Sequence, residues 1–161
     1  MSKTPLPIEL ANPIDALGIA ELSRDLIETG LGWSWTPLRV AREIRDPDSI
    51  VLIARNRSMM IGFAIASFGD EIAHLSLLAV RREWQRKGIG TALFDWLKQS
   101  ALTAGIATMR LELRSNNREA RLFYRALGFE DAGTAPGYYR GRESAVRMQL
   151  NFRQTELGFK P

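Results

Sequence analysis

The sequence predicts an α/β fold with a mixed central sheet of about six to seven strands flanked by about four helices. Short apolar runs and alternating segments, which are typical of strands, are interspersed with segments whose apolar residues recur every three or four positions, which is typical of helices. The resulting order is strand, two helices, three strands, helix, strand, helix and two strands. The composition agrees, because 161 residues with 45% hydrophobic and 25% charged content suit one globular domain.

The first half of the chain predicts a strand, two helices and three further strands. Gly30 ends the first helical pattern. Thr36 and Pro37 suit the start of the second, because threonine caps helices and proline fits their first turn. The expected strands are residues 6–11, 49–55, 60–68 and 71–80, and the expected helices are residues 13–30 and 36–45.

The second half predicts two more helices and three more strands. Residues 107–115 alternate apolar and charged side chains, as in a strand with one buried face. Asn116 and Glu119 have the spacing of a capping box that opens a helix, and Gly128 ends that helix. The expected helices are residues 88–104 and 116–127, and the expected strands are residues 107–115, 129–139 and 144–152.

No repeat or linker divides the chain, so we expect a single domain over residues 1–161, with a core of about 6–152 and a C-terminal tail at 153–161. The absence of cysteine excludes disulfides, zinc–thiolate sites and a thiol nucleophile, and it fits a cytoplasmic location. We expect no signal peptide, because the N-terminus MSKTPLPIEL has no long apolar core after Lys3. We expect no membrane partner, because no apolar run approaches the ~18 residues that span a bilayer. We also expect no metal ion.

The formal net charge is +4, but the basic residues are spread along the chain and interleaved with acidic ones. This distribution favours a solvated surface or an acidic small ligand, so we expect no nucleic-acid partner. The oligomeric state stays open, with a homodimer as one option.

A basic, glycine-containing turn, Gln85-Arg86-Lys87-Gly88-Ile89-Gly90, lies where a predicted strand passes into a helix. It is not a Walker loop, because Lys87 precedes the glycine, and it is not a dinucleotide fingerprint, because Leu93 stands at the third glycine position. Glycines let backbone N–H groups approach an anion, and the helix N-terminus adds partial positive charge. The turn therefore predicts a pyrophosphate site, and the alternative is a tight basic turn without a ligand.

This turn and the later segment SNNREARLFYRALGF resemble the GCN5-related N-acetyltransferase (GNAT) family. The resemblance covers most of residues 60–150 and implies the GNAT fold, with acetyl-CoA as co-substrate. It also implies that the turn holds the pyrophosphate and that the preceding strand binds the pantetheine arm through its backbone. The implied cofactor-binding residues are Leu78, Ala79, Val80, Gln85, Arg86, Lys87, Gly88, Ile89, Gly90, Thr91, Asn117 and Tyr124.

Within the family, the stretch LELRSNNREARLFYRALGF is most similar to bacterial N-terminal alanine acetyltransferases that modify a ribosomal protein. That similarity implies Glu112 as catalytic base and Tyr124 as catalytic acid, with Tyr138 and Tyr139 touching the substrate. The N-terminal segment matches less well, so the acceptor stays open among a protein N-terminus, a lysine and a small amine.

Acetyl transfer needs an amine that has lost a proton, a stabilised thioester oxygen and a protonated leaving thiolate. With no cysteine for an acyl-enzyme, direct transfer within a ternary complex is favoured. Tyr124 is neutral at pH 7 and can donate a proton, and its alternative role is core packing. The alternative function for the whole chain is a non-catalytic acyl-CoA-binding module.

Two side chains compete for the role of base. Glu112 shares a strand face with Arg110 and Arg114, and because nearby cations lower a carboxylate pKa, a structural ion pair is its alternative role. His74, the single histidine, is the rival base, since imidazole relays protons near neutral pH. The last two expected substrate-binding residues are Trp33 and Trp35, which serve either as core or as a wall of the acceptor site.

Overall fold

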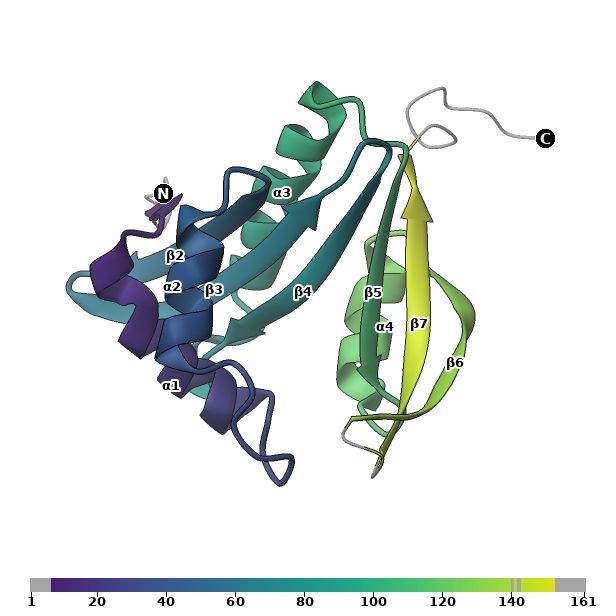
Figure 1. Cartoon of the computed structure of the whole chain (residues 1–161), viewed down its shortest axis with the longest axis horizontal. Helices are drawn as coiled ribbons and strands as arrows, with labels where there is room; N and C mark the ends of the chain where they lie inside the picture. The colour runs from purple at the N-terminus through teal and green to yellow at the C-terminus, as the bar shows by residue number, and fades with distance from the viewer. Residues whose placement is uncertain (1–6, 140, 142, 153–161) are drawn as a thin grey trace. The chain divides into compact units, whose positions relative to one another are not determined.

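The computed structural model describes residues 7–139, 141 and 143–152, which form a seven-stranded sheet and four α-helices (Figure 1). The strands are β1 (Ile8–Leu10), β2 (Ser49–Asn56), β3 (Met59–Phe68), β4 (Ile72–Val80), β5 (Thr108–Arg114), β6 (Glu130–Tyr139) and β7 (Glu143–Asn151). The helices are α1 (Ala16–Leu26), α2 (Pro37–Arg45), α3 (Ile89–Thr103) and α4 (Arg118–Ala126).

The strand order is β1-β2-β3-β4-β5-β7-β6. Strands β4 and β5 pair in parallel, whereas β1 with β2, β2 with β3, β5 with β7 and β6 with β7 pair antiparallel. The predicted α/β fold with a mixed sheet is therefore confirmed.

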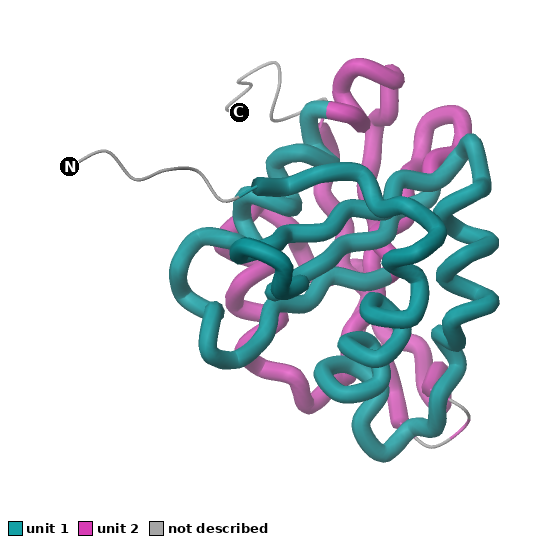
Figure 2. Tube along the Cα trace, turned by 90° about the vertical axis from the view of Figure 1, so that its left-hand side faces the viewer, with its two compact units in different colours: residues 1–67, 77–99 teal, residues 68–76, 100–161 magenta. Residues whose placement is uncertain are grey.

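Two compact units make up the chain, and Figure 2 draws them in different colours. The first unit comprises residues 1–67 and 77–99, and the second comprises residues 68–76 and 100–161. A single domain stays a prediction, and the expected tail at 153–161 lies outside the described residues. Among the helices that the structure describes, none is long and apolar enough to cross a membrane.

In the first unit, α1, α2, β2 and β3 bury apolar faces against one another. Ile19, Val40 and Phe63 are 0% exposed, and full burial of such a side chain contributes about 1.5–3 kcal/mol. Thr36 caps α2 as predicted, because its side chain accepts a hydrogen bond from the backbone N–H of Arg39 at 3.3 Å.

The first helix is shorter than the predicted 13–30. A 3-10 turn over Pro13–Asp15 precedes α1, and α1 ends at Leu26. The spacing of apolar residues did not predict this end. After α1, the side chain of Glu28 accepts hydrogen bonds from the loop at Ser34 and Trp35, a contact that a helical pattern does not reveal.

In the second unit, β5 alternates as predicted. Met109, Leu111 and Leu113 are 0%, 2% and 6% exposed, so one face of the strand is buried. The predicted capping residue of α4 is wrong by one position. Asn117 is the N-cap, and its side chain accepts from the backbone N–H of Ala120 at 3.1 Å. Its φ of −86° and ψ of 80° are not helical, as is typical of an N-cap, and its side-chain oxygen reaches forward to the N–H group three residues later.

Candidate active site

The basic turn lies in the first unit, between the end of β4 and the start of α3. Arg86 and Gly88 have positive φ angles of 61° and 84°, and no atom lies within 4 Å of a Cβ built on Gly88. The side-chain amide of Gln85 donates to the Val80 carbonyl oxygen at 2.9 Å, which ties the turn to the strand end. The carbonyl oxygen of Gly88 accepts a hydrogen bond from the Ala92 N–H at 3.0 Å, so Gly88 lies at the N-terminal end of α3, just before Ile89.

The N–H groups in the first turn of α3 have no partner within the helix, and they carry its partial positive charge. Arg86 and Lys87 add two full charges beside them. The first unit thus offers backbone donors, cations and an open glycine surface to an anion. This arrangement suits a pyrophosphate, and the assignment of the individual cofactor-binding residues stays a prediction.

In the second unit, His74 from β4 and Glu112 from β5 are hydrogen-bonded, with 2.6 Å between Nε2 and Oε1. The parallel register brings them together, because His74 pairs with Arg110 and residues 110 and 112 share a face. Tyr138 on β6 donates its hydroxyl to the same carboxylate oxygen at 3.2 Å. The two residues that compete for the role of base, His74 and Glu112, are therefore hydrogen-bonded to each other.

An ionised carboxylate can only accept hydrogen bonds, so the neutral imidazole of His74 holds its proton on Nε2. Its Nδ1 is then the free base, and it lies 3.3 Å from the hydroxyl oxygen of Ser76. The imidazole is 39% exposed, whereas the Glu112 side chain is 13% exposed. This geometry suits His74 to take a proton and Glu112 to orient the ring and stabilise its charged form.

The hydrogen bond from His74 is the main reason why the pKa of Glu112 lies below its usual value, with smaller contributions from Tyr138 and Arg147. The sequence suggested Arg110 and Arg114 as the neighbours that lower it. Arg114 instead pairs with Glu143 at 3.0 Å, and among the residues that the structure describes Arg147 also forms an ion pair with Glu112, at 3.9 Å. A carboxylate with a lowered pKa is a weak base, which favours its orienting role.

Tyr124, on α4, is 8% exposed and makes edge-on ring contacts with Phe123 and Phe129 at centroid distances of 5.1 and 5.5 Å. Burial raises its pKa, and the nearby Tyr139 raises it further. The phenol is therefore neutral and can donate a hydrogen bond, but a raised pKa makes it a reluctant proton donor. Core packing and hydrogen-bond donation are compatible in this position.

The rings of Tyr138 and Tyr139 meet edge-on, with centroids 4.9 Å apart. Tyr138 is 46% exposed, while burial is the main cause of a raised pKa at Tyr139. One member of the pair is thus available to a ligand, and the other supports it.

Trp33 and Trp35 pack against the core of the first unit and are partly buried. The indole N–H of Trp33 donates to the Ala20 carbonyl oxygen at 3.1 Å, and the guanidinium of Arg39 lies 3.7 Å from the ring centroid of Trp35. Partly buried rings fit both expected roles of these tryptophans, as part of the core and as a wall of the acceptor site.

The sequence reasoning missed Glu28, which is 7% exposed. Its two carboxylate oxygens accept from the backbone N–H groups of Ser34 at 2.9 Å and Trp35 at 3.2 Å, and the Ser34 hydroxyl also bonds it. No local pattern distinguishes this glutamate from a solvated one at a helix end. Ser76 was also missed, although its place two residues after His74 puts it on the same strand face.

The predicted site residues fall into two groups. The turn residues, the end of β4 (Leu78, Ala79 and Val80) and the two tryptophans belong to the first unit, whereas His74, Glu112, Asn117, Tyr124, Tyr138 and Tyr139 belong to the second. Within the second unit, hydrogen bonds join His74, Glu112 and Tyr138.

Residues 19–129 match a family model described as the acetyltransferase (GNAT) family. The chain is 38% identical over 94 residues to the ribosomal protein bS18 alanine N-acetyltransferase of Escherichia coli K12, a match that covers 56% of this chain and 64% of that relative. The chain thus spans less than two thirds of that relative's length. It is also 30% identical over 141 residues to an N-alpha-acetyltransferase of Mycobacterium tuberculosis, covering 84% of this chain and 85% of the relative.

Among solved structures, the ribosomal-protein-S18-alanine N-acetyltransferase from Escherichia coli is similar, with a TM-score of 0.77 and 27% identity. The match covers 90% of this chain and 92% of that one. The similarity therefore includes the N-terminal third, where the sequence motifs were weakest.

Proposed function

The chain belongs to the acetyltransferase (GNAT) family, and from this premise we propose that it moves the acetyl group of acetyl-CoA directly to a primary amine in a ternary complex. The observation that carries the proposal is the 2.6 Å contact between His74 and Glu112, which supplies an oriented base. The turn at residues 85–91 supports acetyl-CoA as donor, because its open glycine and its cations suit a pyrophosphate.

For the acceptor, we propose the α-amine of a protein N-terminus. Two relatives act on protein N-termini by their names, one on an alanine of ribosomal protein bS18 and one as an N-alpha-acetyltransferase. An α-amine also suits a histidine base, because its free pKa of about 7.7–8.0 lies far below the ~10.4 of lysine.

In the proposed reaction, the amine nitrogen attacks the thioester carbon, so that an N–C bond forms and the C–S bond breaks. The proton lost by the amine passes to Nδ1 of His74, either directly or through the Ser76 hydroxyl 3.3 Å away. Glu112 stabilises the imidazolium that results. Tyr124 donates a hydrogen bond to the leaving sulfur, and the thiolate takes its proton from the imidazolium or solvent.

A panel of amines tests the proposal. We expect turnover with acetyl-CoA and peptides that carry a free N-terminus, and slower turnover with peptides whose only amine is a lysine. Binding of acetyl-CoA without turnover on any amine would favour the alternative, a non-catalytic acyl-CoA-binding module. Failure to bind acetyl-CoA would refute the assignment of the turn.

A further inference from the structure

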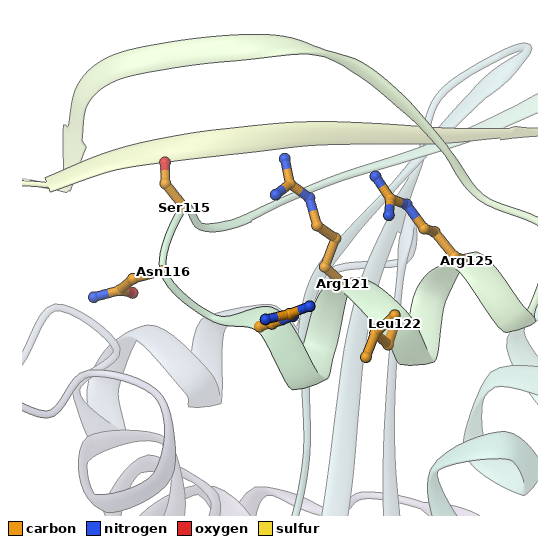
Figure 3. A pocket seen from close by; sticks show the side chains of 6 residues that line it. Ser115, Asn116, Arg121, Leu122 and Arg125 are labelled. Atoms are coloured by element: carbon orange, nitrogen blue, oxygen red, sulfur yellow. The ribbon is translucent and has the colours of Figure 1, made fainter.

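A pocket of about 490 Å³ lies along one face of α4, in the second unit, and none of its lining residues belongs to the proposed acetyl-transfer site (Figure 3). We call it the arginine pocket, and its lining residues are Ser115, Asn116, Arg118, Arg121, Leu122 and Arg125. The helical residues share a face because they are spaced by three or four positions. Arg118 and Arg125 are separated by about 10.5 Å along the helix axis, at 1.5 Å per residue.

The positive charge of the arginine pocket is only partly neutralised. Arg125 and Arg121 share one carboxylate, that of Asp131 on β6, at 2.9 and 3.6 Å. Arg118 has no ion pair with any residue that the structure describes. Nε of Arg121 is shielded from solvent and has no hydrogen-bond partner in the described part of the chain. Among the described residues, Asp131 is thus the one carboxylate that forms an ion pair with any of these three arginines.

An exposed apolar side chain stands among these cations. Leu122 is 57% exposed, and its position three residues before Arg125 and four after Arg118 places it between them. A phosphate group pairs with arginines as a carboxylate does, but it gains nothing from an exposed leucine. A peptide whose carboxylates flank an apolar residue matches both the charges and the leucine.

We propose that the arginine pocket docks an acidic segment of a partner protein, with carboxylates on Arg118 and Arg125 and an apolar side chain on Leu122. The Asp131 pairing is an internal example of the same contact, because guanidinium groups bind carboxylates through geometrically matched hydrogen bonds. The partner's carboxylate competes with Asp131 for Arg121 and Arg125. This proposal uses no residue of the acetyl-transfer site and does not depend on that function.

Fluorescence anisotropy of the full chain with a labelled peptide that places leucine between glutamates tests the docking. We expect Arg118→Gln combined with Arg125→Gln to weaken binding on the order of tenfold or more, because each change removes a charge-assisted hydrogen bond. Arg45→Gln, on the exposed end of α2, is the matched control and should leave affinity unchanged. Equal affinity of the double variant and the wild type would overturn the proposal, provided that both melt at the same temperature.

Asp131→Asn gives a readout of opposite sign. Removing the competing carboxylate should tighten peptide binding several-fold, whereas a patch that merely supports the fold would bind no better. Replacing the peptide's leucine with glycine should weaken binding if Leu122 takes part. If single-stranded RNA of equal charge binds more tightly than the peptide, or if millimolar inorganic phosphate displaces it completely, the acidic-peptide assignment is wrong.

Discussion

His74 and Glu112 are 2.6 Å apart, and the variants Glu112→Gln and His74→Gln tell which of them is the base. The two variants should differ in how far each lowers the rate of acetyl transfer. Glutamine keeps the shape and a carbonyl acceptor but loses the charge that stabilises the imidazolium. A hydrogen bond to a charged group contributes about 1.5–3 kcal/mol and a neutral one about 0.5–1.5 kcal/mol, so the substitution forfeits about 1–1.5 kcal/mol. At 1.36 kcal/mol per tenfold change, we expect kcat/KM of Glu112→Gln to fall about tenfold.

His74→Gln removes the proposed base itself, which typically costs about 10²–10⁴-fold in rate. The loss should shrink as the pH rises above about 8, because an α-amine acceptor then deprotonates without help. The double variant should be scarcely slower than His74→Gln alone, because Glu112 acts only through the imidazole.

Steady-state kinetics on an N-terminal peptide, with acetyl-CoA affinity measured in parallel, gives both numbers. If Glu112→Gln loses about 10²-fold or more while His74→Gln loses less, Glu112 is the base and the reasoning from its lowered pKa is refuted. If neither variant loses rate, deprotonation belongs to solvent.

Three further predictions concern the turn, the tyrosine and the loop after α1. Gly88→Val should abolish the rise in melting temperature that acetyl-CoA causes, whereas Gly105→Val, with a similar φ of 79° and equally open space, should keep it. Tyr124→Phe should lower kcat about 10²–10³-fold with little change in acetyl-CoA affinity, and full activity would contradict a role at the leaving sulfur. Glu28→Gln should weaken the hydrogen bonds that Glu28 accepts from the loop at Ser34 and Trp35. This variant and Trp35→Ala should each raise the KM for the acceptor without changing acetyl-CoA affinity. If neither variant changes that KM, the loop has only a structural role.

The sequence by itself determined the elements and much of their ends, because these depend on local chemistry. Alternation in residues 107–115 predicted a strand with a buried face, and Thr36 marked the start of α2. Gly128, with a φ of 106°, ends α4 as expected. Local chemistry did not determine the start of that helix. Two adjacent asparagines, Asn116 and Asn117, both suit an N-cap, and in the structure Asn117 is the cap.

Only the tertiary structure decided which side chains meet. Strand periodicity predicted that Glu112 shares a face with Arg110 and Arg114. It could not predict which residue of the neighbouring strand lies beside Glu112. The parallel register of β4 and β5 brings His74, 38 residues away in the chain, onto Glu112, while Arg114 is drawn to Glu143. A period of two fixes the face of a side chain and not its partner across the sheet, because register is set by the packing of the whole sheet.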